Sequence, residues 1–144
     1  MSEEPLHILH AEDNPTDAQF FRRAVHKVAP WARMVQLADG VAVRDYLAAC
    51  LTGVGQLPRL VILDIKMPGM TGLEVLEYVR STAGLRQLPV LILSASYESR
   101  DLRTAQQYHA NAYLVKPNRY SELAVLAESL TTFWGRFNQP TVHD

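Results

Sequence analysis

The chain has 144 residues, of which 48% are hydrophobic and 20% charged, and its 14 basic and 15 acidic side chains leave a net charge of −1. A chain of this length forms one ordinary domain, which buries about 70% of the surface of the unfolded chain without a disulfide or a metal. This charge argues against a broad nucleic-acid-binding surface. The apolar runs are far shorter than a membrane span, the N-terminus does not resemble a signal peptide, and the single cysteine, Cys50, fits a reducing compartment. We therefore expect a cytoplasmic protein that binds neither nucleic acid nor membrane.

Five short apolar runs alternate along the chain with segments whose apolar residues recur every three or four positions. The predicted strands cover residues 6–11, 34–38, 60–64, 90–93 and 112–115. The run at 60–64 begins with four apolar residues and no alternation, which is typical of a strand buried on both faces of a parallel sheet. The mixed composition of 34–38 favours an edge strand.

The helical segments begin at recognisable residues. Asn14 and Pro15 open the first helix, because an asparagine caps free N–H groups and a proline at the first helical position loses no hydrogen bond. Asp39 and Gly40 end the second apolar run before the next helical pattern. Strands that alternate with helices predict a doubly wound α/β fold, in which right-handed crossovers place helices on both faces of a five-stranded parallel sheet.

The last predicted helix carries an apolar stripe that continues toward the C-terminus. The stripe consists of Leu123, Leu126, Leu130, Phe133 and Phe137, at steps of three and four. We expect these side chains to share one helix face and cover the sheet. Val125 and Trp134 lie off the centre of this stripe. We expect one domain over residues 1–144, with its core at about 6–133 and an aromatic C-terminal tail at 134–144.

Polar side chains end or follow four of the predicted strands. Glu12 and Asp13 follow the first, Asp64 closes the third, Ser94 follows the fourth and Lys116 follows the fifth. Ligand sites in such folds lie beyond the carboxyl ends of the strands, so we expect these side chains to converge on one edge of the sheet. Each residue alone has an ordinary interpretation as a helix cap, a turn or a solvated side chain. Their joint occurrence at successive strand ends is what indicates a site.

The chemistry of this group suggests a metal and a phosphoryl group. Three carboxylates in one cleft repel each other and raise one another's pKa, and a hard cation relieves that repulsion. Magnesium prefers oxygen ligands and keeps waters and phosphate oxygens, while the amine of Lys116 can balance a further negative group. We expect Asp13 and Glu12 to serve the metal, Glu12 directly or through water. Asp64 ends the central buried strand and is the best candidate to accept a phosphoryl group as an acyl phosphate.

Four segments hold these residues in a specific context. They are Ile8-Leu9-His10-Ala11-Glu12-Asp13-Asn14, Leu63-Asp64-Ile65-Lys66-Met67-Pro68-Gly69-Met70-Thr71-Gly72, Leu93-Ser94-Ala95 and Tyr113-Leu114-Val115-Lys116-Pro117. Together they resemble the receiver domain of two-component response regulators, over about residues 6–133. The resemblance implies a flavodoxin-like receiver fold with the strand order 2-1-3-4-5.

The resemblance also implies a role for each polar residue. A histidine kinase would phosphorylate Asp64, so the chain would be a phosphoacceptor with only self-phosphorylation and autodephosphorylation activity rather than an enzyme. The implied magnesium ligands are Glu12, Asp13, Asp64 and the backbone carbonyl of Lys66. Ser94 and Lys116 would contact the phosphoryl group, and Tyr113 would turn inward as Ser94 moves toward the phosphate.

A narrower resemblance concerns the partner. The segment Arg86–Val90, the loop 52–58 and the pair Phe133-Trp134 look like those of stand-alone response regulators of bacterial and cyanobacterial phytochrome kinases, which implies a bacteriophytochrome as the sensor histidine kinase. The grouped C-terminal aromatics also suggest a homodimer through the final helix and tail. Alternatively, these aromatics fold back onto their own core.

Other functions remain open at this point. The chain could act as a phosphate sink or as an intermediate phosphorelay carrier for a non-phytochrome kinase. A transcription factor would need a helix-turn-helix domain, for which too few residues follow the final helix. A flavin carrier of this fold would need a Ser/Thr/Gly loop where Glu12 and Asp13 would repel the flavin phosphate. An aspartate phosphatase is the least favoured. His10, where the family usually has an apolar residue, is interpreted as a buried neutral imidazole.

Overall fold

The computed structural model describes residues 5–138 and has five strands in one parallel sheet. The strands are β1 (His7–Ala11), β2 (Arg33–Leu37), β3 (Leu60–Leu63), β4 (Val90–Ser94) and β5 (Ala112–Val115). Their order across the sheet is β2-β1-β3-β4-β5, and every neighbouring pair is parallel. The predicted flavodoxin-like fold is confirmed. The strand β2 lies at the edge, as its mixed composition predicts.

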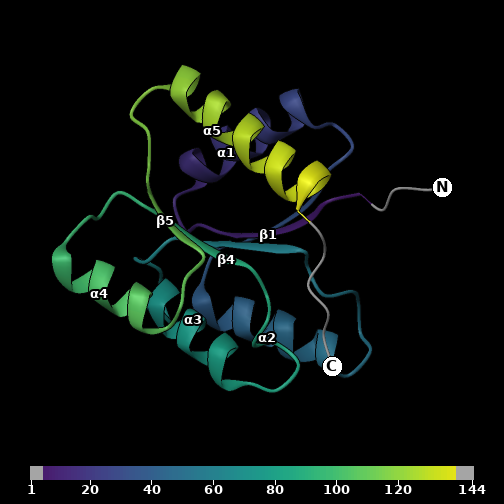
Figure 1. Cartoon of the computed structure of the whole chain (residues 1–144), viewed down its shortest axis with the longest axis vertical. Helices are drawn as coiled ribbons and strands as arrows, with labels where there is room; N and C mark the ends of the chain where they lie inside the picture. Colours follow the sequence, from purple (N-terminus) through teal and green to yellow (C-terminus); the bar gives the residue numbers. More distant parts are fainter. Residues whose placement is uncertain (1–4, 139–144) are drawn as a thin grey trace.

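Helices cover both faces of the sheet (Figure 1). They are α1 (Pro15–Val28), α2 (Gly40–Leu51), α3 (Gly72–Ser81), α4 (Ser99–Gln107) and α5 (Tyr120–Thr132), followed by the π-helical turn η1 (Phe133–Phe137). In Figure 1, α1 and α5 lie above the sheet, and α2, α3 and α4 lie below it. All five strands are parallel, so their carboxyl ends meet at the same edge of the sheet.

Side chains of the inner strands β1 and β3 alternate between two apolar layers. In β1, Ile8 packs into the layer beneath α1 and α5, and Leu9 packs into the layer on the α2 side. Ile62 and Leu63 of β3 divide in the same way, and all four side chains are at most 1% exposed. A strand that is buried on both faces must be apolar at successive positions, which explains the absence of alternation in β3.

Three helices that begin beside the sheet's carboxyl edge, α1, α2 and α3, start with side-chain caps, and in α2 the cap is Asp39. Asn14 Oδ1 accepts hydrogen bonds from the N–H of Asp17 (3.1 Å) and of the residue before it (2.9 Å), and Pro15 occupies the first helical position. Thr71 and Glu74 form a reciprocal capping box at the start of α3. The caps satisfy free N–H groups and hold the loops that precede the helices in place.

The end of the last helix differs from the prediction. The three leucines of the predicted stripe pack against the core, but Phe133 and Phe137 are 52% and 72% exposed. Trp134 takes the next core position instead and packs, half-buried, against the same layer. The N–H of Asn138 donates to the carbonyl of Phe133 at 2.7 Å, five residues back, and closes a π-helical turn. This wider turn carries Phe137 away from the core stripe.

The first residues of the predicted tail, 134–138, pack against the rest of the molecule. Gly135 lies against the ring of Trp31, where a larger residue would collide. Arg59 Nη2 donates to the carbonyl of Asn138 at 2.8 Å. These contacts close the molecule near the amino ends of β2 and β3, opposite the polar strand ends. The rest of the expected tail, residues 139–144, lies outside the described residues.

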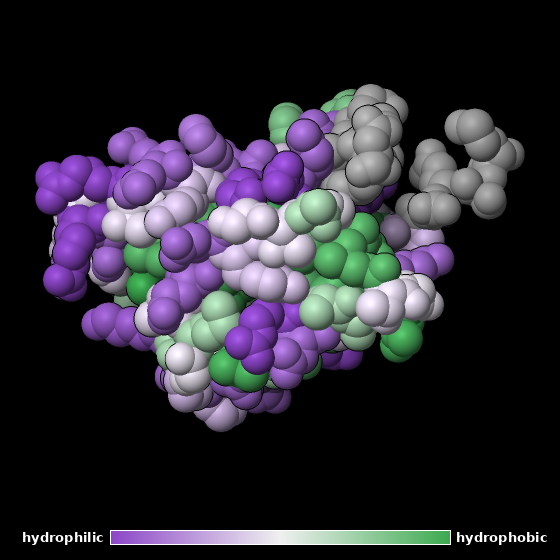
Figure 2. All heavy atoms as spheres, turned by 90° about the horizontal axis from the view of Figure 1, so that it is seen from below, coloured by the Kyte–Doolittle hydropathy of each residue, from purple (hydrophilic) through white to green (hydrophobic). Residues whose placement is uncertain are grey.

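The outer surface of the helices is mainly polar. Seen from the side of α2, α3 and α4, most of the surface is hydrophilic, and hydrophobic residues gather toward the right of the view (Figure 2). Such a surface is typical of amphipathic helices that cover a sheet. Within residues 5–138, no helix is long and apolar enough to cross a membrane.

Candidate functional site

The carboxyl ends of four strands bring the predicted polar side chains together. Glu12 and Asp13 follow β1, Asp64 follows β3, Ser94 ends β4 and Lys116 follows β5. The N–H of Asp64 donates to the carbonyl of Ala11 (3.1 Å), and the N–H of Lys116 donates to the carbonyl of Ser94 (2.9 Å). These two bonds continue the sheet ladder past the strand ends, so the backbone itself sets the side chains beside one another.

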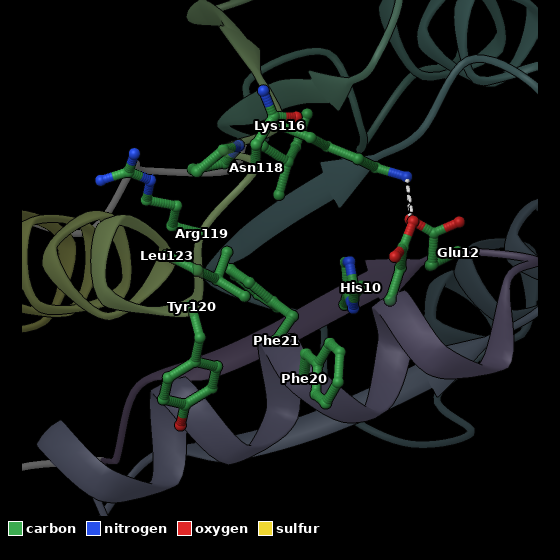
Figure 3. Close-up of a pocket in the computed structure, with 12 residues that line it drawn as sticks. His10, Glu12, Phe20, Phe21, Lys116, Asn118, Arg119, Tyr120 and Leu123 are labelled. Atoms are coloured by element: carbon green, nitrogen blue, oxygen red, sulfur yellow. Dashed lines mark hydrogen bonds and ion pairs between the residues drawn. The ribbon is translucent and has the colours of Figure 1, made fainter.

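The ammonium of Lys116 is the centre of a network of charges. Its Nζ donates to Asp64 Oδ2 at 2.8 Å and to Asp17 Oδ2 at 3.1 Å, and it forms an ion pair with Glu12 Oε1. Figure 3 shows the side chain of Lys116 extending toward Glu12. The side chains of Lys116, Glu12 and Asp64 are 18%, 2% and 9% exposed, so water screens these charges only weakly.

This network keeps Asp64 ionised. Burial alone would raise the pKa of Asp64, but the hydrogen bond and the charge of Lys116 outweigh it and hold that pKa below its usual range. Burial alone would lower the pKa of Lys116, but hydrogen bonds to Asp64, Glu12 and Asp17 outweigh it and raise that pKa. Asp64 is therefore a carboxylate beside a permanent ammonium, which suits a nucleophile that must be deprotonated.

Glu12 has the opposite tendency. Burial raises the pKa of Glu12 to about 7, although hydrogen bonds from Lys116 and from the backbone N–H of Asn14 favour its charged form. The nearby charge of Asp64 also raises the Glu12 pKa. The two carboxylates that share the Lys116 ammonium thus differ in acidity: the pKa of the more deeply buried Glu12 is raised, and that of Asp64 is lowered.

A cluster of three carboxylates offers ligands for a cation. Oxygens of Glu12, Asp13 and Asp64 lie within 4.8 Å of one another, and Asp13 is exposed while the other two are buried. Hard carboxylate oxygens with one side open to water are the donor set that magnesium uses. A divalent cation would also relieve the repulsion that raises the Glu12 pKa. The residues present therefore fit a magnesium ion.

Asp64 also faces an open cavity. The cavity has a volume of about 580 Å³ and is lined by Asp64, Lys66, Ser94 and residues 95–99, which form the β4–α4 loop and the start of α4. One carboxylate oxygen of Asp64 accepts from the N–H of Ile65 at 2.7 Å, and the other accepts from Lys116. The cavity gives a phosphoryl donor access to this carboxylate, with Ser94 on the same lining.

Ser94 and Tyr113 are linked through one residue of the β4–α4 loop. The hydroxyl of Tyr113 donates to the carbonyl of Ser96 at 2.7 Å, and the N–H of Ser96 donates to Ser94 Oγ at 3.3 Å. Ser96 Oγ also donates to Asp101 in α4 at 2.8 Å. A movement of Ser94 would therefore disturb the hydrogen bonds that hold Tyr113 and the start of α4.

A glycine lets α3 approach the phosphoacceptor candidate. Gly72 is the first residue of α3, and a Cβ built on it would overlap the carbonyl oxygen of Asp64. The N–H of Gly72 donates to the carbonyl of Ile65 at 3.0 Å. The loop after β3 can fold back over its own strand end only because this position lacks a side chain.

His10 is a buried neutral side chain, as interpreted from the sequence. Burial lowers the pKa of His10 to about 3. Its Nδ1 lies 3.0 Å from Nε2 of Gln36, which also donates to the carbonyl of Ala18 at 2.8 Å, and its ring packs against Phe21 with centroids 4.5 Å apart. His7 lies on the opposite face of β1, beside Tyr46, so the two histidines are not a metal pair.

Two contacts of this site were missed by sequence reasoning. Asp17 contacts Lys116 from the first turn of α1, and Ser96 links Ser94 to Tyr113. A signal for Asp17 existed, because it lies one helical turn after Asp13, on the end of α1 that begins at the site. No sequence pattern pointed to Ser96, because it links Ser94 to Tyr113 through its backbone N–H and carbonyl.

Comparisons with known proteins agree with this geometry. Residues 8–128 match the family described as the response regulator receiver domain. The chain is 36% identical over 138 residues to the probable methanogenesis regulatory protein FilR2 of Methanothrix harundinacea, covering 96% of this chain and 89% of that protein.

Two solved structures are similar over nearly the whole chain. The phosphorylated cyanobacterial phytochrome response regulator RcpA has a TM-score of 0.87 and 26% identity, covering 96% of this chain and 99% of that chain. The bacteriophytochrome response regulator AtBRR has a TM-score of 0.72 and 33% identity, covering 94% of this chain and 99% of that chain.

Proposed function

Because the chain belongs to the response regulator receiver domain family, we propose that it is a stand-alone response regulator that accepts a phosphoryl group on Asp64 and then changes conformation. In this proposal, residues 1–144 form one receiver domain. The chain is a phosphoacceptor that has no diffusible substrate of its own beyond the donor that phosphorylates it.

One observation supports this role most directly: Asp64 is ionised, contacts a shielded ammonium and lines an open cavity. A carboxylate oxygen of Asp64 attacks the phosphorus of a phosphohistidine, and an acyl phosphate forms. The P–N bond breaks, and its electron pair leaves with the imidazole. The Lys116 ammonium, within reach of Asp64, compensates the negative charge of the phosphoryl oxygens.

We assign the magnesium ligands to Glu12, Asp13, Asp64 and the backbone carbonyl of Lys66. The three carboxylates form the acidic cluster, and Lys66 lines the same cavity as Asp64. Bound magnesium supplies positive charge that neutralises phosphoryl oxygens. Asp13, the exposed member, is the ligand most open to the incoming ion.

The proposed switch uses Ser94 and Tyr113. In the structure, the Ser94 hydroxyl accepts from the Ser96 N–H, and Tyr113 holds the Ser96 carbonyl. When Ser94 Oγ moves to donate to a phosphoryl oxygen, it leaves the Ser96 N–H, and Tyr113 turns inward into the space that opens. Phosphorylation biases this equilibrium only because the two arrangements bind the phosphoryl group differently.

We propose that the phosphoryl donor is a sensor histidine kinase, specifically a bacteriophytochrome, and that both act in the cytoplasm. Support for the phytochrome link comes from RcpA and AtBRR, whose names associate them with phytochromes and which align with over nine-tenths of this chain. A phosphate sink or an intermediate carrier for another kinase is the less favoured alternative.

We also propose a homodimer through α5 and η1. Val125, Phe133 and Phe137 are 64%, 52% and 72% exposed and line one shallow groove with Glu128 and Thr132. Grouped exposed aromatics at a polar rim are typical of an interface anchor. A second copy is the occupant we propose, because in a two-fold contact the phenyl rings of each copy can enter the groove of the other.

The test of the proposed function is phosphoryl transfer to Asp64→Asn. This variant keeps the size of the side chain but lacks the nucleophilic carboxylate. We expect wild-type protein with magnesium to be labelled by acetyl phosphate and by a phosphorylated bacteriophytochrome, and the variant to remain unlabelled. Asp45→Asn, an exposed carboxylate in α2, is the matched control and should be labelled normally. Normal labelling of Asp64→Asn would rule out Asp64 as the acceptor.

A further inference from the structure

We infer that Asp17 is a positioning residue that competes with Glu12 and Asp64 for the ammonium of Lys116. By drawing the Lys116 ammonium toward α1, Asp17 makes the two site carboxylates easier for a cation to engage, and it occupies an N–H donor that a phosphoryl oxygen would otherwise use. The inference rests on the proposed function, because it concerns the same carboxylates.

The number of donors on the ammonium sets up this competition. A lysine ammonium has three N–H donors, and Lys116 Nζ contacts three carboxylates: Asp64 (2.8 Å), Asp17 (3.1 Å) and Glu12. Every donor therefore has a carboxylate partner, and a phosphoryl oxygen that binds Lys116 must displace one of them. The weakest of the three is Asp17, whose side chain is 44% exposed, against 9% for Asp64 and 2% for Glu12.

Asp17 is placed for this contact by the start of α1. The Asn14 side chain accepts from the N–H of Asp17 at 3.1 Å, and Pro15 fixes the first helical position, so the carboxylate projects from a defined helical turn. The contact joins residues that are 99 positions apart in the chain. Asp17 is not one of the three clustered carboxylates that would hold a cation, so it stays available to Lys116 when those are engaged.

The surroundings leave Lys116 room to change partners. Lys116 and Asp17 both line a cavity of about 210 Å³ between α1 and the start of α5, where Phe20, Tyr120 and Leu123 are also found (Figure 3). The side chain of Lys116 is thus positioned mainly by its ion pairs, because part of it borders this cavity and is not closely packed. Without Asp17, the ammonium would remain on Asp64 and Glu12, where it opposes a cation that needs the same oxygens.

The test is a magnesium titration of four proteins: wild type, Asp17→Asn, Lys116→Gln and the double variant. We expect Asp17→Asn to weaken magnesium binding about three-fold, the scale of a half-exposed ion pair. In the Lys116→Gln background, the same substitution should change the affinity much less. A change of equal size in both backgrounds would show that Asp17 acts only through its charge on the whole site, and would overturn the inference. Unchanged affinity in the single variant would overturn it as well.

Two controls separate contact from net charge. Asp17→Glu keeps a carboxylate within reach of Lys116 and should restore wild-type affinity. Glu122→Gln removes an exposed carboxylate from the first turn of α5 and should leave the affinity unchanged. A comparable loss in Glu122→Gln, or failure of Asp17→Glu to restore binding, would contradict a specific contact.

Phosphorylation by acetyl phosphate at saturating magnesium is a second readout. We expect Asp17→Asn to be labelled about three-fold faster than wild type, because a neutral amide oxygen holds the Lys116 donor less strongly than a carboxylate and yields it more readily to a phosphoryl oxygen. An unchanged or slower rate would overturn the competition. If wild type takes no label while the magnesium affinities follow the expected pattern, the proposed function fails and the competition for Lys116 stands.

Discussion

At the residue scale, the side chain of Glu12 is buried more deeply than its short polar segment suggests. It follows a strand in a short polar segment, yet its side chain is 2% exposed, and burial raises its pKa to about 7 from an ordinary value of 4.5. A carboxyl group with a raised pKa in the folded state contributes stability below its unfolded pKa. That contribution is lost as the pH rises through the folded pKa.

We therefore predict that the contribution of Glu12 to the stability of the metal-free protein falls by about 1 kcal/mol between pH 6 and pH 8. His10 acts in the opposite direction, because its folded pKa of about 3 lies below the ordinary 6.5 and it therefore adds stability as the pH rises through 6.5. The Glu12 effect is for this reason measured as the difference between wild type and Glu12→Gln. Urea unfolding at several pH values measures the effect. Between pH 6 and pH 8 the stability of Glu12→Gln should change more favourably than that of wild type by about 1 kcal/mol, and magnesium should reverse the wild-type loss above pH 7. An equally steep decline in Glu12→Gln would refute the assignment.

At the element scale, the first turn of α1 connects helix stability to the site. Asn14 caps the helix and fixes the backbone of Asp17, whose carboxylate contacts Lys116. The α3 helix approaches in a similar way, through the Thr71 cap and the close contact of Gly72 with the backbone of Asp64. The capped start of α1 follows the end of β1 within four residues, whereas α3 reaches the site because the loop 65–71 folds back until Gly72 lies against the backbone of Asp64.

We predict that Asn14→Ala lowers the free energy of unfolding by about 1 kcal/mol, because two N–H groups of α1 lose their acceptor. Thermal or urea unfolding measures this change. Arg119→Ala is a matched control: Arg119 precedes α5 and makes no side-chain capping bond, so its loss should cost less than about 0.5 kcal/mol. Equal costs for the two substitutions would mean that the Asn14 cap contributes little.

At the scale of the whole molecule, the α5–η1 face is the surface through which we propose that two copies associate. Trp134 packs against the core, whereas Val125, Phe133 and Phe137 remain exposed on one groove. Of the two accounts of the C-terminal aromatics, folding back onto the core holds for Trp134, whereas the homodimer stays a proposal that the exposure of the two phenylalanines supports.

We predict that Phe133→Ser with Phe137→Ser converts a dimer to a monomer and changes the melting temperature of the monomer little, because both rings are more than half exposed. Sedimentation over a range of protein concentrations measures the change. Val54→Ser, an exposed apolar residue in the α2–β3 loop, is the control and should leave the dimer intact. A wild-type protein that sediments as a monomer at every concentration would contradict the proposal.

Much of the fold and of the candidate site followed from the sequence by itself. The continuous apolar run of β3 predicted a strand buried on both faces, and parallel strands end at one edge of the sheet. The polar residues at those ends, from Glu12 to Lys116, therefore had to lie near one another. Local patterns sufficed here, because the spacing of apolar residues and the identity of cap residues are set within a few positions of the chain.

The tertiary structure alone decided the features that depend on distant contacts. The helical spacing placed Phe137 on the core stripe, but the π-helical turn, closed by Asn138 and packed near Trp31 and Arg59, carries it to the surface. The pairing of Asp17 with Lys116 spans 99 positions, and the raised pKa of Glu12 depends on burial by the assembled edge of the sheet. Side-chain periodicity and capping are local, whereas helix termination against a neighbour, ion pairing and desolvation arise only when separate segments meet.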